Sequence, residues 1–293
     1  MTPLGRIVSQ WFGKTAIYSD FRFAYEEAQA IIDEPKAAHE GVPGEIAEAV
    51  LTLHSLATKL RKKRFAAGAI NFDRPEMKVE VDEKGRPVNV YQKISKEANW
   101  LIEEFMLLAN KEVATCVTKG LRLKEPTFVY RIHDEPDYDK VRNLKDFVKH
   151  FGYQMGSVNN GREVACEINA LLEKAKGKPE CGAIEIIALR SMSRAKYSTD
   201  NVGHYGLGFD YYTHFTSPIR RYPDMMVHRL LTHYLDKGKN EDKNRYEEMC
   251  KHSSQREHLA TEAERSSTKY KLAEYMQDKV GQEFEGSVSG VTE

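Results

Sequence analysis

The sequence predicts an α+β fold in which helices outnumber strands. Apolar residues recur at helical spacing between Gly44 and Phe65, and again over about 95–119. Residues 77–82 and 88–91 alternate apolar and polar side chains on either side of a Glu-Lys-Gly-Arg-Pro turn, which predicts an antiparallel hairpin. Long helices beside a few antiparallel strands are typical of the α+β class.

The other elements follow from the same two periodicities. In chain order we expect an extended segment at 4–18, a short helix at 25–32 ended before Pro35, a loop at 36–44, a strand at 127–132, helices at 137–151, 163–176 and 181–193, an irregular Gly- and Tyr-rich stretch at 197–213, a helix at 222–235, a charged loop at 239–243 and a final helix of about 30 residues ending near 280.

Composition sets broad limits on function. The chain has 293 residues, of which 41% are hydrophobic and 30% charged, a balance typical of a folded, soluble protein. Lys plus Arg equals Asp plus Glu at 44 each, so any nucleic-acid surface must be local. The four cysteines lack the spacing of a zinc site or a disulfide framework, and no apolar run approaches the roughly 20 residues of a membrane span. A cytoplasmic protein that does not enter a membrane is expected.

Two basic regions are candidates for anion binding. The run 59–64 closes a predicted helix, where its cations either complement the helix dipole or contact phosphate. Between 190 and 233, six basic residues face three acidic ones, with four histidines and several tyrosines interleaved. Arginine grips phosphate oxygens with a planar fork, and Ser217 before Pro218 predicts a helix start that offers free N–H groups to an anion. Alternatively, these arginines pair with nearby carboxylates.

The motifs of this second region resemble those of a known family. The run HFTSPIRRYPDMMVHR and the preceding GHYGLG are similar to the signature of the ribonuclease II/ribonuclease R (RNB) exoribonucleases. The stretches NWLIEEFMLLANKEVA, FVYRIHDEP, LRSMSRAKYS and HLATEAER occur in the family's order and spacing. The resemblance covers about 5–280 and is nearest to the ribonuclease R branch.

The resemblance implies roles for individual residues. Arg220 matches an arginine that contacts the RNA phosphate at the cleavage site, and Glu264 matches a glutamate that handles the terminal nucleotides; both are therefore catalytic candidates. Tyr25 and Glu103 match residues that read the ribose, and Phe72 matches an aromatic that stacks on a base near the 3′ end. Five further residues of the motif region are expected to bind RNA, namely His204, Tyr205, Ser217, Arg221 and Arg229.

Structural alternatives remain for four of these positions. Tyr25 and Phe72 would also suit core packing, and Glu264 would also suit an ion pair on its own helix. Glu103 would also suit a solvated helix face, and Glu104 replaces it as the ribose reader if the register shifts by one residue.

The resemblance also implies an architecture and an activity. Long helices packed on a curved antiparallel β-sheet would form a channel that admits the 3′ end of single-stranded RNA. Residues 1–280 would be part of the RNB catalytic domain, and 281–293 the first strand of an OB-fold RNA-binding domain. The full-length protein would be a monomeric, processive 3′-to-5′ exoribonuclease that hydrolyses single-stranded and structured RNA to nucleoside 5′-monophosphates.

The magnesium ligands of the family are not expected in this chain. The family holds Mg²⁺ with an aspartate cluster that lies before the matched region, and the acidic residues within 134–139 are better suited to a helix start. No metal is therefore expected on the chain alone, which would bind RNA without cutting it. One alternative is a non-catalytic RNB homologue that only binds RNA. Another, unrelated to nucleases, is a helical protein that binds a nucleic acid or a partner.

Overall fold

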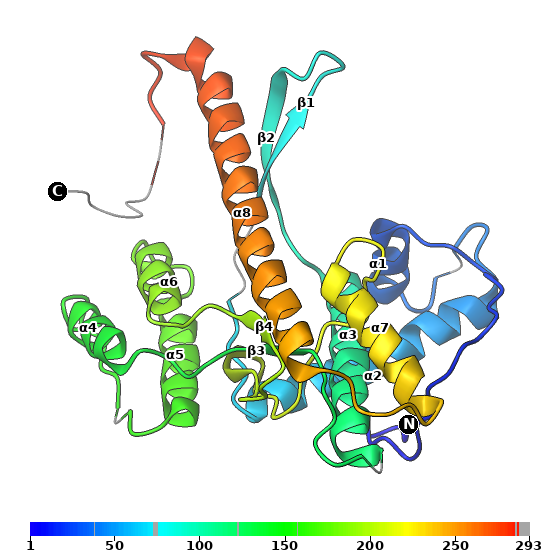
Figure 1. Cartoon of the computed structure of the whole chain (residues 1–293). Helices are drawn as coiled ribbons and strands as arrows, with labels where there is room; N and C mark the ends of the chain where they lie inside the picture. The colour runs from blue at the N-terminus through cyan, green and yellow to red at the C-terminus, as the bar shows by residue number, and fades with distance from the viewer. Residues whose placement is uncertain (38, 73–75, 122, 157, 285, 287–293) are drawn as a thin grey trace.

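The structure is a computed structural model that describes residues 1–37, 39–72, 76–121, 123–156, 158–284 and 286. Two helical lobes stand on either side of one long helix (Figure 1). The first lobe contains α1 (Tyr25–Asp33), α2 (Gly44–Ala66), α3 (Glu97–Thr115), which continues into a π-helical turn (Cys116–Gly120), and α7 (Tyr222–Leu235). The second lobe contains α4 (Tyr138–Lys149), α5 (Gly161–Ala175) and α6 (Cys181–Arg190).

Each lobe has its own hydrophobic core. In the second lobe, the apolar faces of α4, α5 and α6 bury Leu144, Ile168 and Ile184 completely. In the first lobe, the C-terminal half of α3 packs against α7 and the segment around Phe128. Every helix predicted from the apolar spacing is present, with bounds shifted by a few residues at most, apart from the last turn of the second long helix, which is π-helical.

The strands form two separate antiparallel pairs. β1 (Glu76–Val81) and β2 (Pro87–Lys93) make the predicted hairpin, and β3 (Tyr130–Ile132) pairs with β4 (Lys196–Ser198). The α+β class is confirmed, although the strands in the described residues lie in two small sheets and not in one curved sheet. β3 is shorter than the expected strand because the N–H and hydroxyl of Thr127 donate to Asn240 and Glu241, outside any sheet.

The long helix α8 (Lys243–Met276) connects the two sheets. Asp242 caps its start by accepting from the N–H of Asn244 at 2.9 Å. Its first half packs on β4, and its second half runs along the hairpin, where Lys271 Nζ donates to the carbonyl of Gly85 at 2.5 Å (Figure 1). Of its described residues only Cys250 is buried, so α8 is polar on nearly all sides.

The expected OB-fold strand at 281–293 falls largely outside the described residues, and 281–284 and 286 form no strand. No helix within the described ranges is long and apolar enough to cross a bilayer.

A cluster of rings lies where the two lobes meet. We call His133, Tyr197, His204, Tyr212 and His214 the ring cluster. Their centroids are 5.1 to 5.7 Å apart from one ring to the next, in edge-to-face geometry. Tyr205, the residue after His204, packs against the core of the second lobe, while Tyr197 belongs to the core of the first lobe. Tyr212 is joined to α3 of the first lobe by its hydrogen bond with Asn110.

Burial keeps two imidazoles of the ring cluster neutral. It lowers the pKa of His214 to about 2, and the positive charges of Arg221 and Arg131 add to this effect. It lowers the pKa of His204 to about 3, with a further contribution from His133. The hydroxyl of Tyr197, whose pKa burial raises to about 12, lies 2.8 Å from Nδ1 of His214, and the two groups share a hydrogen bond.

The core of the second lobe should be sensitive to truncation. Ile168 is completely buried, so Ile168→Ala removes apolar contacts and leaves a cavity. We expect the free energy of unfolding to fall by about 2–5 kcal/mol, measured by urea denaturation. Ile17→Ala is the matched control, because Ile17 is 92% exposed and should cost less than about 0.5 kcal/mol. Equal losses in the two variants would contradict the assigned core.

The buried histidines should make stability depend on pH. The unfolded chain protonates each imidazole near its ordinary pKa of about 6.5, whereas folded His214 and His204 stay neutral down to about 2 and about 3. The free energy of unfolding should therefore fall as the pH drops below about 6.5, by about 1.4 kcal/mol per pH unit for each histidine. Urea denaturation between pH 7 and 4.5 measures this slope. His214→Gln should flatten it, whereas His252→Gln, at an exposed position, should leave it unchanged.

Candidate nucleic-acid interface

The arginine loop, residues 214–221, is held by two buried side chains that lie outside it. Asn110 of α3 is 3% exposed, and its Oδ1 accepts from the N–H groups of Phe215 at 2.9 Å and Thr216 at 3.2 Å. Its Nδ2 donates to the hydroxyl of Tyr212 at 3.1 Å. One amide therefore fixes the start of the loop and a ring of the ring cluster together.

Asp224 of α7 fixes the other end of the loop. Its carboxylate is completely buried, and Oδ1 accepts from the N–H of Ser217 at 2.8 Å and from the guanidinium of Arg221 at 2.7 Å. The prediction that Ser217 and Pro218 begin the helix is wrong, because α7 begins at Tyr222 and Asp224 takes the N–H of Ser217. Ser217 and Pro218 instead open a turn, in which the N–H groups of Arg220 and Arg221 donate to the carbonyl of Ser217.

The two neighbouring arginines of the loop differ in their surroundings. Arg221 is paired with Asp224, and its side chain is 20% exposed. Arg220 is exposed, and no carboxylate of the described residues lies within ion-pair distance of its guanidinium. Burial is the main cause of the lowered pKa of His214, and the positive charge of Arg220 adds to it. The alternative in which the arginines pair with carboxylates therefore holds for Arg221 alone.

The GHYGLG motif, residues 203–208, forms a loop held by His133. Nδ1 of His133 accepts from the N–H of Gly206 at 3.0 Å, and Nε2 lies 2.8 Å from the carbonyl of Ser193, to which it donates. Burial lowers the pKa of His133, which is consistent with this neutral form. Glycine is needed at the second and third glycine positions of the motif, Gly206 and Gly208. A Cβ on Gly206 would lie 2.9 Å from His133 Nδ1, and Gly208 has φ +65° and packs against the backbone at Ala69.

A cavity of about 570 Å³, the His204 cavity, opens beside this loop. Its walls include His133, Arg162, Asn201, His204 and Tyr205, but not Arg220. The structure thus brings His204 and Tyr205 to one cavity and leaves Arg220 outside it. The residues that the resemblance assigns to RNA binding are therefore divided between an exposed arginine and this cavity.

Unsatisfied polar atoms gather around the two loops. Within the described residues, the buried side-chain atoms without a hydrogen-bond partner are His204 Nδ1, Tyr205 Oη, Thr216 Oγ1, Arg221 Nε and Asp224 Oδ2. Each such atom costs about 1–3 kcal/mol in a folded protein, and native structures keep few of them. Their concentration here indicates a site where function, and not stability, determines the residues.

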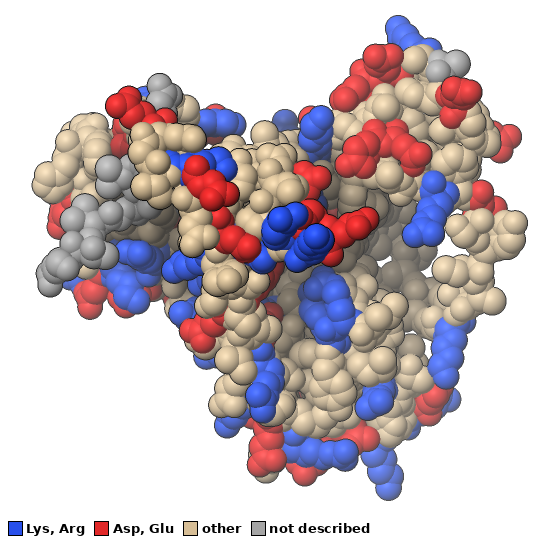
Figure 2. Space-filling view, turned by 90° about the horizontal axis from the view of Figure 1, so that it is seen from above, with Lys and Arg blue, Asp and Glu red and all other residues tan. Residues whose placement is uncertain are grey.

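Basic residues also approach the ring cluster from its other sides. Arg131 on β3 pairs with Glu257 of α8 at 2.6 Å and lies over the ring of Tyr197. Arg194 contacts the ring of His258 on α8. On the face seen from above, basic and acidic side chains are interspersed over most of the surface (Figure 2). The positive potential is therefore local, as the neutral composition requires.

Two predicted residues lie on helices outside the arginine loop. Glu264 lies on α8 two turns beyond Glu257, where it is exposed and its charge raises the pKa of Lys78 on the hairpin. Arg229 is exposed on α7, and its charge acts on Tyr246 of α8. Neither contacts Arg220, and for Glu264 the neighbouring cation is on the hairpin and not on its own helix.

The three predicted readers of ribose and base lie on separate elements. Tyr25 opens α1, is 47% exposed and lines an apolar groove between α1, α2 and α3. Glu103 on α3 is 48% exposed and pairs with Arg64 at 3.3 Å, whereas its neighbour Glu104 is buried against the same guanidinium. Phe72 follows α2 and packs, partly buried, against the core of the second lobe, as the core alternative requires.

The basic run 59–64 makes contacts within the chain. Lys59 and Lys63 donate to the carbonyls of Pro3 and Leu4, each at 2.8 Å, and tie the extended N-terminal segment to α2. Arg64 is 7% exposed and pairs with Glu104. Arg61 lies over the rings of Phe65 and Trp100. These contacts differ from both alternatives, the helix dipole and phosphate, although Lys63 and Arg64 do lie in the last turn of α2.

The acidic stretch 134–139 caps a helix. Asp137 accepts from the N–H of Asp139 at 3.0 Å at the start of α4, and these backbone contacts lower its pKa. Asp134 pairs with Lys196, Glu135 accepts from the Tyr138 hydroxyl, and Asp139 pairs with Arg142. No group of three metal-ligating side chains occurs in the described part of the chain, and this stretch does not fit Mg²⁺.

Several residues of this site escape the sequence patterns. Asn110 falls in the buried stripe of α3 with Leu107 and Ala114, and a polar residue at that position was the available signal. Arg131 and His133 lie in a short strand segment and act through partners 60 or more residues away, which no local pattern reveals.

Comparisons with known proteins agree on one family. The RNB domain matches residues 1–237. Ribonuclease R 1 of Lactococcus lactis is 39% identical over 304 residues, covering 100% of this chain and 36% of that protein. Ribonuclease R of Aquifex aeolicus is 38% identical, covering 95% of this chain and 39% of that protein.

A solved structure shows the same fold. Mycoplasma genitalium RNase R in complex with ribose methylated single-stranded RNA matches with a TM-score of 0.82 at 24% identity, covering 92% of this chain and 42% of that chain. The chain spans less than half the length of each of these three proteins. By its sequence and its fold, the chain belongs to the RNB domain family.

Proposed function

We propose that this chain holds the 3′-terminal part of a single-stranded RNA at the arginine loop. The observation that carries the proposal is the unpaired, exposed guanidinium of Arg220 on a loop fixed by Asn110 and Asp224. A guanidinium with no carboxylate partner is available to phosphate oxygens, which it can grip bidentately. The unsatisfied buried polar atoms next to it support a binding site at this place.

For the whole protein we propose the activity that the relatives' names suggest. The names give ribonuclease activity. From the resemblance of the sequence motifs we further propose that the protein is a processive 3′-to-5′ exoribonuclease, which hydrolyses single-stranded and structured RNA to nucleoside 5′-monophosphates. Its Mg²⁺ is held by carboxylates outside the residues described, since those described do not fit it. Arg220 stabilises the charge on the phosphate in this proposal, as arginine does in phosphoryl transfer.

We propose the remaining RNA contacts from the positions at which this sequence matches the family motifs. Glu264 handles the terminal nucleotides from α8, and Tyr25 and Glu103 read the ribose. The residues proposed to complete the RNA contacts are Phe72, His204, Tyr205, Ser217, Arg221 and Arg229. His204 acts as a neutral ring, because burial lowers its pKa to about 3. Ser217 acts through its place in the turn, since its N–H is already donated to Asp224.

Removing the Arg220 guanidinium should weaken RNA binding. We expect Arg220→Ala to lower the affinity of the chain for a single-stranded RNA by about tenfold, the value of one charge-assisted hydrogen bond. The slope of log affinity against log salt should shrink by about 0.7, because one phosphate contact is lost. Fluorescence anisotropy at several salt concentrations measures both quantities.

Arg142→Ala is the control, since Arg142 is equally exposed on α4 but pairs with Asp139. An affinity that does not change with salt, or equal effects of the two variants, would refute the proposal. We also expect the pure chain to show no Mg²⁺-dependent trimming of labelled RNA. Trimming that disappears in Arg220→Ala would show instead that the metal ligands lie within this chain.

Asn110 should control RNA binding through the geometry of the loop. Asn110→Leu leaves two backbone N–H groups of the loop unsatisfied, so we expect RNA affinity to fall by about the factor seen for Arg220→Ala. Asn110→Asp keeps the acceptor, and the Tyr212 hydroxyl can donate to its second oxygen, so most of the affinity should return.

The matched control for Asn110 is Asn240→Leu. Asn240 makes the same kinds of contact with a backbone N–H, a tyrosine hydroxyl and a carbonyl, but at the far end of α7. The Asn240→Leu variant should be less stable than the unchanged chain but should bind RNA with the same affinity. If Asn240→Leu weakened RNA binding as much as Asn110→Leu, general destabilisation would explain both.

A further inference from the structure

A second cavity, of about 640 Å³, lies between α2, α3, the N-terminal segment and residues 208–211. We call it the lysine cavity. Its charged walls are Arg6, Lys63, Arg64, Lys111, Lys119, Glu104, Glu112 and Asp210, so basic residues outnumber acidic ones by five to three. Its other walls include Ile7, Leu60, Leu107, Leu108 and Phe209. A cavity of this size with apolar walls and a few convergent charges suits a small organic ligand.

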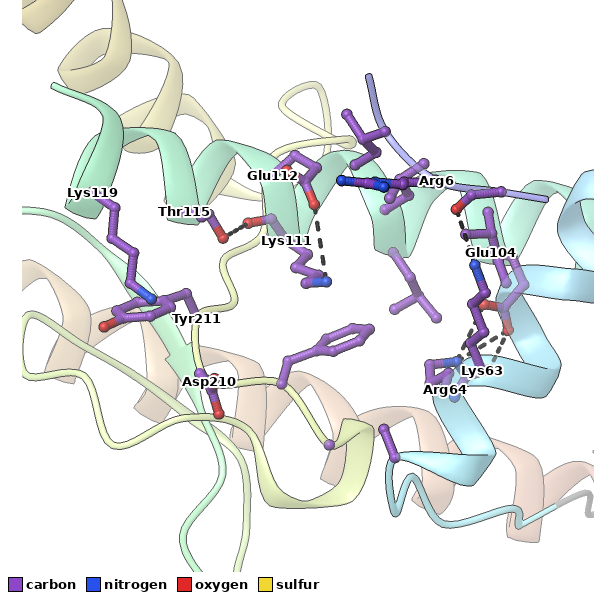
Figure 3. Close-up of a pocket in the computed structure, with 18 residues that line it drawn as sticks. Arg6, Lys63, Arg64, Glu104, Lys111, Glu112, Thr115, Lys119, Asp210 and Tyr211 are labelled. Carbon is purple, nitrogen blue, oxygen red and sulfur yellow. Dashed lines mark hydrogen bonds and ion pairs between the residues drawn. The ribbon is translucent and has the colours of Figure 1, made fainter. Parts of the chain in front are cut away.

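Aromatic rings hold two of the ammonium groups in this cavity. Lys111 Nζ lies 5.5 Å from the ring centroid of Phe209, and Lys119 Nζ lies 4.6 Å from that of Tyr211. In Figure 3, Lys111 points into the cavity and Lys119 reaches over Tyr211. A ring attracts an ammonium group without cancelling its charge, so the cation remains available to an anion.

The acidic residues of the cavity cancel only part of this charge. Glu104 is buried against Arg64, with Arg61 3.9 Å away, and is therefore already neutralised. Glu112 is 4.0 Å from Lys111, a weak pairing. Within the described ranges, neither Arg6 nor Lys119 has a carboxylate within ion-pair distance. Once Glu104 and Arg64 have offset each other, the four cations Arg6, Lys63, Lys111 and Lys119 face two carboxylates, Glu112 and Asp210, so a surplus of positive charge remains. Arg6, Lys111, Lys119 and Asp210 are labelled in Figure 3.

The lysine cavity is next to the His204 cavity. Ala67 and the segment from Gly208 to Tyr211 line both of them, so this segment is a shared wall. A ligand in the lysine cavity would therefore touch the loop that also carries His204 and Tyr205. This position is distinct from the arginine loop, none of whose residues lines the lysine cavity.

We infer that the lysine cavity binds the phosphate group of a nucleotide, with Lys111, Lys119 and Arg6 as its contacts. The cavity is large enough for a nucleoside, and its apolar walls suit one. Inorganic phosphate alone would not fill it. The nucleotide is either a free nucleoside 5′-monophosphate or part of an RNA strand, since both present the same phosphate. The inference rests on the proposed function only for the choice of a nucleotide as the ligand.

Isothermal titration calorimetry of the chain with 5′-AMP, adenosine and inorganic phosphate tests this inference. We expect saturable binding of 5′-AMP, no binding of adenosine, and weaker binding of phosphate. Lys119→Gln and Lys111→Gln should each weaken 5′-AMP binding by about tenfold, because each removes one charge-assisted contact. Lys62→Gln is the matched control, since Lys62 is exposed on α2 and does not line the cavity.

Competition with a single-stranded RNA separates the two sources of the nucleotide. If RNA displaces 5′-AMP and its own affinity falls in Lys119→Gln, the ligand is part of the strand. If RNA binding is unaffected by Lys119→Gln, the ligand is the free nucleotide. Absence of 5′-AMP binding, or equal binding by Lys119→Gln and Lys62→Gln, would overturn the inference. Arg220→Ala should not alter 5′-AMP binding, so failure of the arginine loop and failure of this cavity give different results.

Discussion

Two buried side chains, Asn110 and Asp224, fix the position of the arginine loop. Between them they accept hydrogen bonds from three backbone N–H groups of the loop and from Arg221. Without these hydrogen bonds the backbone of the loop would bind water and take up many conformations, because its own residues form only one turn. Since both anchors are at most 3% exposed, water does not compete for these bonds. The exposed Arg220 thus stands on a rigid base.

The same residues connect the loop to the contact between the two lobes. Asn110 also binds Tyr212, and Tyr212 packs on His204 and His214. Tyr205, the residue after His204, packs against the core of the second lobe. His133 must be neutral for this arrangement, because its Nδ1 accepts from the backbone N–H of Gly206. The same residues therefore pack the lobes together and position the arginine loop. All the unsatisfied buried side-chain atoms among the described residues lie in or next to the two loops that these residues hold.

Apolar periodicity predicted most of the helices, which bury one stripe, and alternation predicted the hairpin; α8 is the exception, since Cys250 is its only buried residue among those described. The helix start predicted at Ser217 is wrong, because Asp224, seven residues later, accepts from the N–H of Ser217 and the chain forms a turn before α7 begins at Tyr222. Asn110 acts on residues 105 and 106 positions away, and no local pattern carries that information. The family resemblance pointed to Arg220, Glu264 and Arg229. Which of them lie together depends on the directions of α7 and α8, which the sequence does not give.

The neighbouring arginines show how one sequence motif can serve both structure and binding. Arg221 and Arg220 are chemically identical, yet the first meets a buried carboxylate and the second meets water. Leaving Arg220 unpaired costs little stability, because an exposed ion pair contributes about 0–1 kcal/mol at most. In the proposed function, a phosphate therefore binds a guanidinium that has no other ionic partner to lose. Lys119 follows the same logic, since an aromatic face positions it while leaving its charge uncompensated. Preorganised but unneutralised cations are what a polyanionic substrate requires.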